Sequence, residues 1–190
     1  MRKLILQEFI TLDGMAAESD GGTNFINTAM QGDTGFVAGQ EKLISSANTM
    51  LLGRKTYEMF AAYWPAVKEE GEKEFAGKIN GMEKFVVSNT LDAAPWGDLK
   101  PATVIAGRAE DEIAKLKQQP GSDIIIWGSI SLAQSLINAR LIDQLRLITC
   151  PTILSQGRPF FTAKIAPQSL TLRTTHPQTS GAVELVYTPK

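Results

Sequence analysis

Apolar residues occur along the chain in short clusters whose spacing changes from one segment to the next. The segment DIIIW, residues 123–127, is almost entirely apolar, which is typical of a strand buried on both faces. Further strands are expected at residues 3–10, 49–52, 84–88, 103–106 and 145–150. Helical spacing, or a charged composition typical of a surface helix, predicts helices at residues 36–47, 55–63, 68–78, 109–118 and 132–139. Strands and helices therefore alternate over most of the chain.

The segments between and after these elements complete the fold prediction. Residues 18–35 and 93–101 are rich in glycine and small polar residues and are expected to be loops. Near the end of the chain, residues 169–175 and 182–187 alternate in polarity, which favours an antiparallel hairpin. The pattern predicts an α/β fold with a mostly parallel central sheet, helices on both faces and an antiparallel C-terminal edge. We expect residues 1–190 to form a single domain.

Composition excludes several classes of function. The net charge of −1 argues against binding to nucleic acid through phosphate neutralisation. The chain has one cysteine, Cys150, and one histidine, His176, so an internal disulfide and a multi-cysteine or multi-histidine metal site are not expected. No apolar run reaches the ~18 residues that a membrane span needs, and no signal-peptide pattern is present. We therefore expect a cytoplasmic protein that binds neither nucleic acid, membrane nor metal.

Small, hydroxyl-bearing or cationic residues follow three of the predicted strands. They are Gly53, Arg54, Lys55 and Thr56; Ser88 and Asn89; and Gly128, Ser129 and Ile130. In open α/β sheets, ligands bind beyond the carboxyl ends of the strands. The first and third groups also open helices, whose free N–H groups and partial positive charge suit a phosphate. The guanidinium of Arg54 suits a phosphate monoester such as an adenosine 2′-phosphate.

Each group also has an ordinary structural interpretation. Gly128 and Ser129 could form a helix N-cap with no ligand, Arg54 could belong to a surface ion pair, and Ser88 and Asn89 could form a turn. The three groups together, each at a strand end, favour a phosphate-bearing ligand without identifying it.

The motifs TLDGMAA (11–17), LLGRKTYEMF (51–60), FVVSNTL (85–91) and the segment 124–161 resemble, in this order, the dihydrofolate-reductase-like superfamily. The chain is most similar to the branch related to the C-terminal reductase domain of riboflavin biosynthesis proteins. The resemblance covers essentially the whole chain. It implies a mostly parallel sheet of about eight strands and NADPH as the cofactor.

The resemblance also implies roles for individual residues. Gly53, Arg54 and Thr56 match the turn that holds the 2′-phosphate and the diphosphate. Ser88 and Asn89 match the strand exit beside the adenosine ribose and the 2′-phosphate. The turn from Gly128 to Ile130 matches the glycine turn under the diphosphate and the nicotinamide side. The loop from Asp13 through Ala16 and Ala17 matches the segment that lines the nicotinamide.

The resemblance implies an NADPH-dependent reductase that transfers a hydride to a small heterocyclic substrate, pterin-like or pyrimidine-like. A homodimer is also implied, with residues 145–154 and the GRPFF segment as a suitable interface. The alternative is a non-catalytic nucleotide-binding or regulatory module that retains the NADPH cleft. No catalytic residue can be assigned from the sequence. The side chains considered as proton donors are Asp13, Glu18, Asp20, Asp33 and Tyr57.

Overall fold

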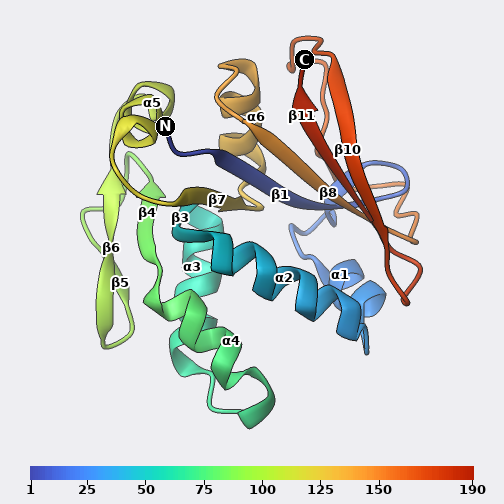
Figure 1. Ribbon diagram of the computed structural model, residues 1–190, viewed down its shortest axis with the longest axis horizontal. Helices are drawn as coiled ribbons and strands as arrows, with labels where there is room; N and C mark the ends of the chain where they lie inside the picture. The colour runs from blue at the N-terminus through green and yellow to red at the C-terminus, as the bar shows by residue number, and fades with distance from the viewer.

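The computed structural model describes residues 1–190, except for the side chain of Thr34. Its main sheet has nine strands and crosses the whole molecule (Figure 1). In spatial order the strands are β10 (Leu170–Pro177), β11 (Val183–Pro189), β8 (Gln144–Cys150), β1 (Leu4–Thr11), β7 (Asp123–Trp127), β3 (Ala47–Gly53), β4 (Glu83–Val87), β6 (Leu99–Ile105) and β5 (Ala94–Trp96). A second, two-stranded sheet pairs β2 (Met15–Ala17) with β9 (Arg158–Pro159).

The central strands are parallel, as the sequence predicts. Strand β1 pairs in parallel with β7 and β8, β3 pairs in parallel with β7 and β4, and β4 pairs in parallel with β6. The strands at both edges of the sheet pair antiparallel: β11 pairs with β8 and β10 at one edge, and β5 pairs with β6 at the other. The predicted α/β architecture is therefore confirmed, and β5 adds an antiparallel strand at the edge opposite the C-terminal hairpin.

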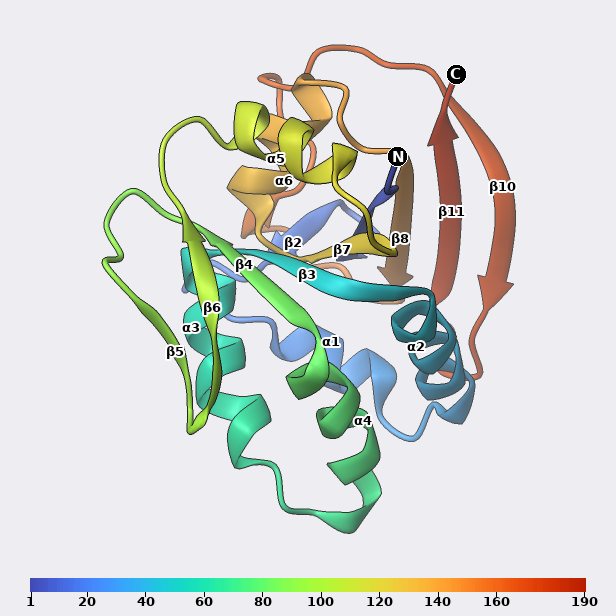
Figure 2. The same ribbon diagram turned by 60° about the vertical axis from the view of Figure 1, so that its left-hand side comes forward.

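The helices form two layers, one on each face of the sheet (Figures 1 and 2). They are α1 (Asn24–Met30), α2 (Thr34–Ser46), α3 (Arg54–Tyr63), a 3₁₀ turn η1 (Trp64–Ala66), α4 (Glu70–Gly81), α5 (Ala109–Gln118) and α6 (Ile130–Asn138). Helices α5 and α6 bury Ile113, Leu116 and Leu136 against Leu4 and Leu6 of β1. Helices α2, α3 and α4 cover the other face.

That other face holds the second part of the core. Leu43 of α2, Tyr57 of α3 and Ile79 of α4 pack there with Met50 of β3 and Ile125 of β7. Because the two clusters enclose the sheet, β7 is buried on both faces, which explains its continuous apolar sequence. In the described part of the chain, no helix is long and apolar enough to cross a membrane.

The prediction of a loop over residues 18–35 is wrong, because α1 and the start of α2 lie within it. Glu18 stabilises the start of α1 by accepting a hydrogen bond from the backbone N–H of Phe25, at 3.1 Å. Phe25 and Ala29 then pack on Cys150 at the end of β8. Tertiary packing of a few apolar residues thus stabilises a short helix within a polar, glycine-rich segment.

The prediction of a loop over residues 93–101 is also wrong, because β5 and the start of β6 form an antiparallel pair there. Trp96 anchors the pair. Its ring is completely buried, and its Nε1 donates to the Oδ1 of Asn80 at 2.7 Å. The proline and glycine residues that favour a loop were therefore outweighed by the burial of one large aromatic side chain.

Replacing Trp96 should destabilise the protein strongly. We expect Trp96→Ala to lower the free energy of unfolding by about 3–5 kcal/mol, because it removes a buried aromatic side chain and leaves Asn80 without its donor. Urea unfolding followed by circular dichroism measures this change. In the same hairpin Leu99 is 46% exposed, so Leu99→Ala should change stability by no more than about 0.5 kcal/mol. Equal effects of the two substitutions would contradict the role given to Trp96.

Candidate functional site

The three strand ends singled out in the sequence lie beside one another in the structure. Strands β7, β3 and β4 are consecutive parallel neighbours, so their carboxyl ends meet at one end of the sheet. Strand β3 leads through Gly53 into α3, β7 leads through Gly128 and Ser129 into α6, and β4 leads into residues 88–90. The structure thus brings together the groups of residues that the sequence predicts to bind a cofactor.

One hydrogen bond joins the first and third exits. The backbone N–H of Gly53 donates to the Oγ of Ser129 at 2.8 Å, and this hydroxyl donates to the carbonyl of Trp127 at 3.1 Å. Gly128 and Ser129 both have left-handed backbone angles, with φ of 54° and 61°. This conformation costs roughly 1 kcal/mol at a non-glycine residue, so the contacts of the Ser129 side chain help to hold the turn in place.

The first turns of α3 and α6 are therefore held side by side. Within the described structure, neither helix has a side chain that caps its N-terminus. The N-cap residue of α3 is Gly53, which has no side chain, and the hydroxyl of Ser129, the N-cap residue of α6, is engaged with Gly53 and Trp127. The N–H groups of a helix's first turn have no partner within the helix. Two adjacent helix N-termini with partial positive charge form a site suited to a phosphate or diphosphate.

Arg54 lies at the outer side of this pair of turns. Its Nη1 is 3.5 Å from the Oγ1 of Thr90, and its Nε is 3.7 Å from the Oε1 of Glu58. The side chains of Arg54 and Glu58 are 49% and 52% exposed, so their ion pair is weak and can be exchanged for a ligand at little cost. The adjacent Lys55 is also exposed.

Ser88 and Asn89 shape the exit of β4. The Oγ of Ser88 accepts from the backbone N–H groups of Thr90 and Leu91, each at 3.2 Å. The Oδ1 of Asn89 accepts from the N–H of Gly107 at 2.7 Å. These bonds support the turn interpretation of the two residues. Their contact with a cofactor stays a prediction.

Ala16 and Ala17 lie in β2, and their side chains are buried, with 3% and 4% of their surface exposed. The small sheet of β2 and β9 reaches α6, because Arg158 on β9 lies 3.4 Å from the Oγ of Ser131. Ile130, the first residue of α6, packs on the core. At Ala16, Ala17 and Ile130 the side chains therefore serve packing, and their contact with a cofactor stays a prediction.

The five side chains considered as proton donors all have structural contacts. Asp13 accepts from Thr11 and from the N–H groups of Ser155 and Leu154, which lower its pKa. Asp33 accepts from the N–H groups of Ser180 and Phe36, and these bonds lower its pKa to about 2. Both carboxyl groups are therefore ionised at neutral pH and hold no proton to donate.

The remaining three are engaged as well. Glu18 holds the start of α1, and Asp20 accepts from the N–H of Gly22 at 2.7 Å. The hydroxyl of Tyr57 donates to the carbonyl of Pro95 at 2.6 Å. Burial raises the pKa of Tyr57, which keeps it a neutral donor in the core.

A different carboxyl group, that of Glu8 on β1, lies next to Gly128, since a Cβ at residue 128 would be 4.0 Å from its Oε1. It is 4% exposed, and its Oε1 accepts from the N–H of Phe9 at 3.2 Å, while its Oε2 is buried without a partner among the described residues. Burial raises its pKa to about 8, and the bond from Phe9 opposes the shift only in part. Glu8 is therefore a neutral acid at pH 7. The sequence analysis missed it, although an acid at an inward position of the run Leu4, Leu6, Glu8, Ile10 was a usable signal.

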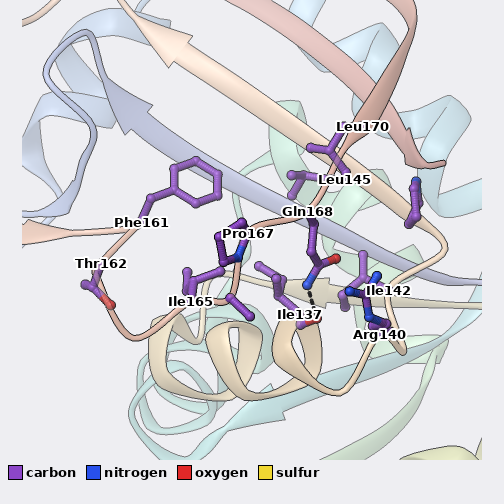
Figure 3. A pocket seen from close by; sticks show the side chains of 12 residues that line it. Ile137, Arg140, Ile142, Leu145, Phe161, Thr162, Ile165, Pro167, Gln168 and Leu170 are labelled. Carbon is purple, nitrogen blue, oxygen red and sulfur yellow. Dashed lines mark hydrogen bonds between the residues drawn. The ribbon is translucent and has the colours of Figure 1, made fainter.

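An apolar pocket of about 230 Å³ lies at the other end of α6 (Figure 3). Ile165, Pro167 and Leu170 face Ile137 of α6 and Leu145 of β8. None of the predicted cofactor-binding residues lines this pocket, and its one charged side chain, that of Arg140, is exposed. It therefore lies apart from the paired helix N-termini.

Comparison with known proteins shows the family of this chain. The model of the RibD C-terminal domain matches residues 2–185. The chain belongs to this family. YyaP of Bacillus subtilis (strain 168), an uncharacterized protein, is 30% identical over 187 residues, which are 98% of this chain and 94% of YyaP. The family predicted from the GRKTYE turn and the segment 124–161 is thereby confirmed.

Solved structures share the fold of this RibD C-terminal domain. A pyrimidine reductase-like protein from Corynebacterium diphtheriae superposes with a TM-score of 0.72 at 17% identity, over 100% of this chain and 92% of the other. Dihydrofolate reductase from Enterococcus faecalis, solved with NADP(H), superposes with a TM-score of 0.65 at 13% identity, over 99% of this chain and 96% of the other. These two likenesses show a shared fold, and the Enterococcus protein with this fold was solved in complex with NADP(H).

The raised pKa of Glu8 should make stability depend on pH. Between its unfolded value of 4.5 and its folded value of about 8, the folded state holds the proton and the unfolded state does not. The free energy of unfolding should therefore fall as pH rises through this window, by the order of 1–4 kcal/mol, and level off above it. Urea unfolding at a series of pH values measures the slope.

Glu8→Gln removes the titrating group and keeps the shape of the side chain, so this component of the slope should disappear. Glu83→Gln, at the exposed amino-terminal end of β4, should retain it. The same slope in Glu8→Gln as in the unsubstituted protein would show that Glu8 does not titrate in this range.

Proposed function

We propose that the protein is an NADPH-dependent reductase that transfers a hydride to a small heterocyclic substrate, pterin-like or pyrimidine-like. The observation that carries the proposal is the hydrogen bond between Gly53 and Ser129, which fixes two uncapped helix N-termini side by side. This arrangement fits the diphosphate of a dinucleotide, which needs several N–H donors in a small area.

The residues around the paired turns fit the rest of the cofactor. Arg54 offers a weakly paired guanidinium for the 2′-phosphate, next to the hydroxyl of Thr90. A side-chain atom at residue 128 would stand 3.7 Å from the Oγ1 of Thr56, so glycine leaves this space open to a ligand. When bound, NADPH supplies the hydride, and the protein binds it, orients it and excludes water.

The proposed substrate class follows from the relatives. The Corynebacterium neighbour is described as pyrimidine reductase-like and the Enterococcus neighbour as a dihydrofolate reductase, so the substrates of this fold include planar nitrogen heterocycles. At 17% and 13% identity, neither neighbour selects between the two ring systems for this chain.

The cofactor proposal is tested by titrating the purified protein with NADPH and NADH and following ligand fluorescence. We expect NADPH to bind at least about tenfold more tightly, because a charge-assisted bond to the 2′-phosphate contributes about 1.5–3 kcal/mol. Arg54→Ala should abolish this preference. Arg173→Ala, which removes an exposed arginine on β10, should keep it. Failure of both nucleotides to bind would overturn the proposal.

Turnover separates a reductase from a non-catalytic module with the same cleft. We expect the protein to oxidise NADPH when a pterin or an aminopyrimidine is added, with dihydrofolate as the first compound, at about 1 s⁻¹ or faster for a good substrate. Loss of NADPH absorbance measures the reaction, and Arg54→Ala should slow it at low NADPH concentration. Tight NADPH binding with no oxidation across both compound classes would favour the non-catalytic alternative.

A further inference from the structure

Glu8 carries a buried polar atom that the protein itself does not satisfy. Its Oε2 has no hydrogen-bond partner among the described residues, and the whole residue is 4% exposed. A buried polar group without a partner costs about 1–3 kcal/mol. Among the described residues, the Nε2 of Gln7 on the same strand is the other buried side-chain atom without a partner. The unpartnered oxygen of Glu8 points to a group outside the chain that completes it.

The position of Glu8 indicates which ligand would contact its carboxyl group. A Cβ at residue 128 would lie 4.0 Å from the Oε1 of Glu8 and 3.7 Å from the Oγ1 of Thr56. Thr56 and Gly128 belong to the two helix N-termini described above. The Oε1 of Glu8 therefore lies next to Gly128, on the β1 side of the proposed dinucleotide site.

Few charges act on this group. Its neighbours in the sheet are Leu147 on β8, which is its partner in register, and Gly128 beyond the end of β7, and neither is ionisable. The charged side chains on the elements around this site are Arg54, Lys55 and Glu58 on α3 and Arg158 on β9, and all four are exposed. Burial alone therefore favours the neutral acid, which has an O–H to donate.

We propose that Glu8, as a neutral acid, donates a hydrogen bond to an acceptor oxygen of the dinucleotide bound over Gly128. The inference rests on the proposed function and assigns to it a residue on β1. An O–H donor directed at a phosphate or carboxamide oxygen forms a short, strong bond. A carboxylate at the same place would repel an anionic ligand. The protein therefore binds the dinucleotide when Glu8 is protonated.

The proposal predicts that the affinity for NADPH depends on pH through the titration of Glu8 alone. We expect the Kd of NADPH to be constant from about pH 7 to 7.5, where the 2′-phosphate is a dianion, and to rise above pH 8 by up to tenfold per pH unit, since binding takes up one proton. Glu8→Gln keeps a donor but does not titrate, so its Kd should stay constant from pH 7 to pH 9.5. Glu83→Gln, as the matched carboxyl control, should behave like the unsubstituted protein.

A second measurement observes the group directly. In protein labelled with ¹³C at the glutamate carboxyl, the resonance lost in Glu8→Gln should titrate near pH 8, and NADPH should move its titration to higher pH. The same shift with 2′-phospho-ADP-ribose would locate the acceptor on the diphosphate, and its absence would locate the acceptor on the nicotinamide carboxamide.

The outcomes distinguish this inference from the proposed function. Tight NADPH binding with the same dependence on pH in Glu8→Gln and the unsubstituted protein would overturn the role of Glu8 and leave the reductase proposal standing. No NADPH binding at any pH would overturn both.

Discussion

Ile124, Ile125 and Ile126 have no exposed surface, because helices cover both faces of the sheet at β7. A polar side chain in this strand would be buried without water, so the strand is restricted to apolar residues. Polar groups that could bind a ligand therefore occur only at the carboxyl end of β7, where the chain turns at Gly128 and continues as α6. Strand β3 likewise ends in three fully buried apolar residues, Met50, Leu51 and Leu52, before it turns at Gly53. The covered parallel sheet thus concentrates the polar groups of neighbouring strands at one end.

The geometry of that end depends on how the two turns are joined. The Ser129 hydroxyl bonds to Gly53 instead of capping its own helix, which holds α3 and α6 together and leaves the N–H groups of both first turns directed outward. Arg54 adds an exposed, weakly paired cation at the side, and Glu8 adds a buried acid next to Gly128. The proposed dinucleotide with a 2′-phosphate would use all three kinds of donor.

Sequence patterns predicted the covered strands well, because a run such as DIIIW is compatible with few other environments. They predicted Gly53 and Gly128 as turn residues for the same local reason. They failed at residues 93–101, where Trp96 stabilises a strand through contacts with residues distant in sequence. They also missed Glu8, because its burial depends on β7, β8 and α6 packing around β1. Turns and strands can be predicted from the local sequence, whereas the pKa of a buried acid depends on the residues that the complete fold packs around it.

The central claim is that the paired N-termini of α3 and α6 hold the diphosphate of NADPH. A crystal structure of the protein with NADPH tests it most directly. The account predicts diphosphate density between Gly53 and Gly128, within hydrogen-bonding distance of first-turn N–H groups of both helices, with the 2′-phosphate at Arg54. Nucleotide density elsewhere, such as in the apolar pocket beside Ile137, or none at saturating NADPH, would contradict it.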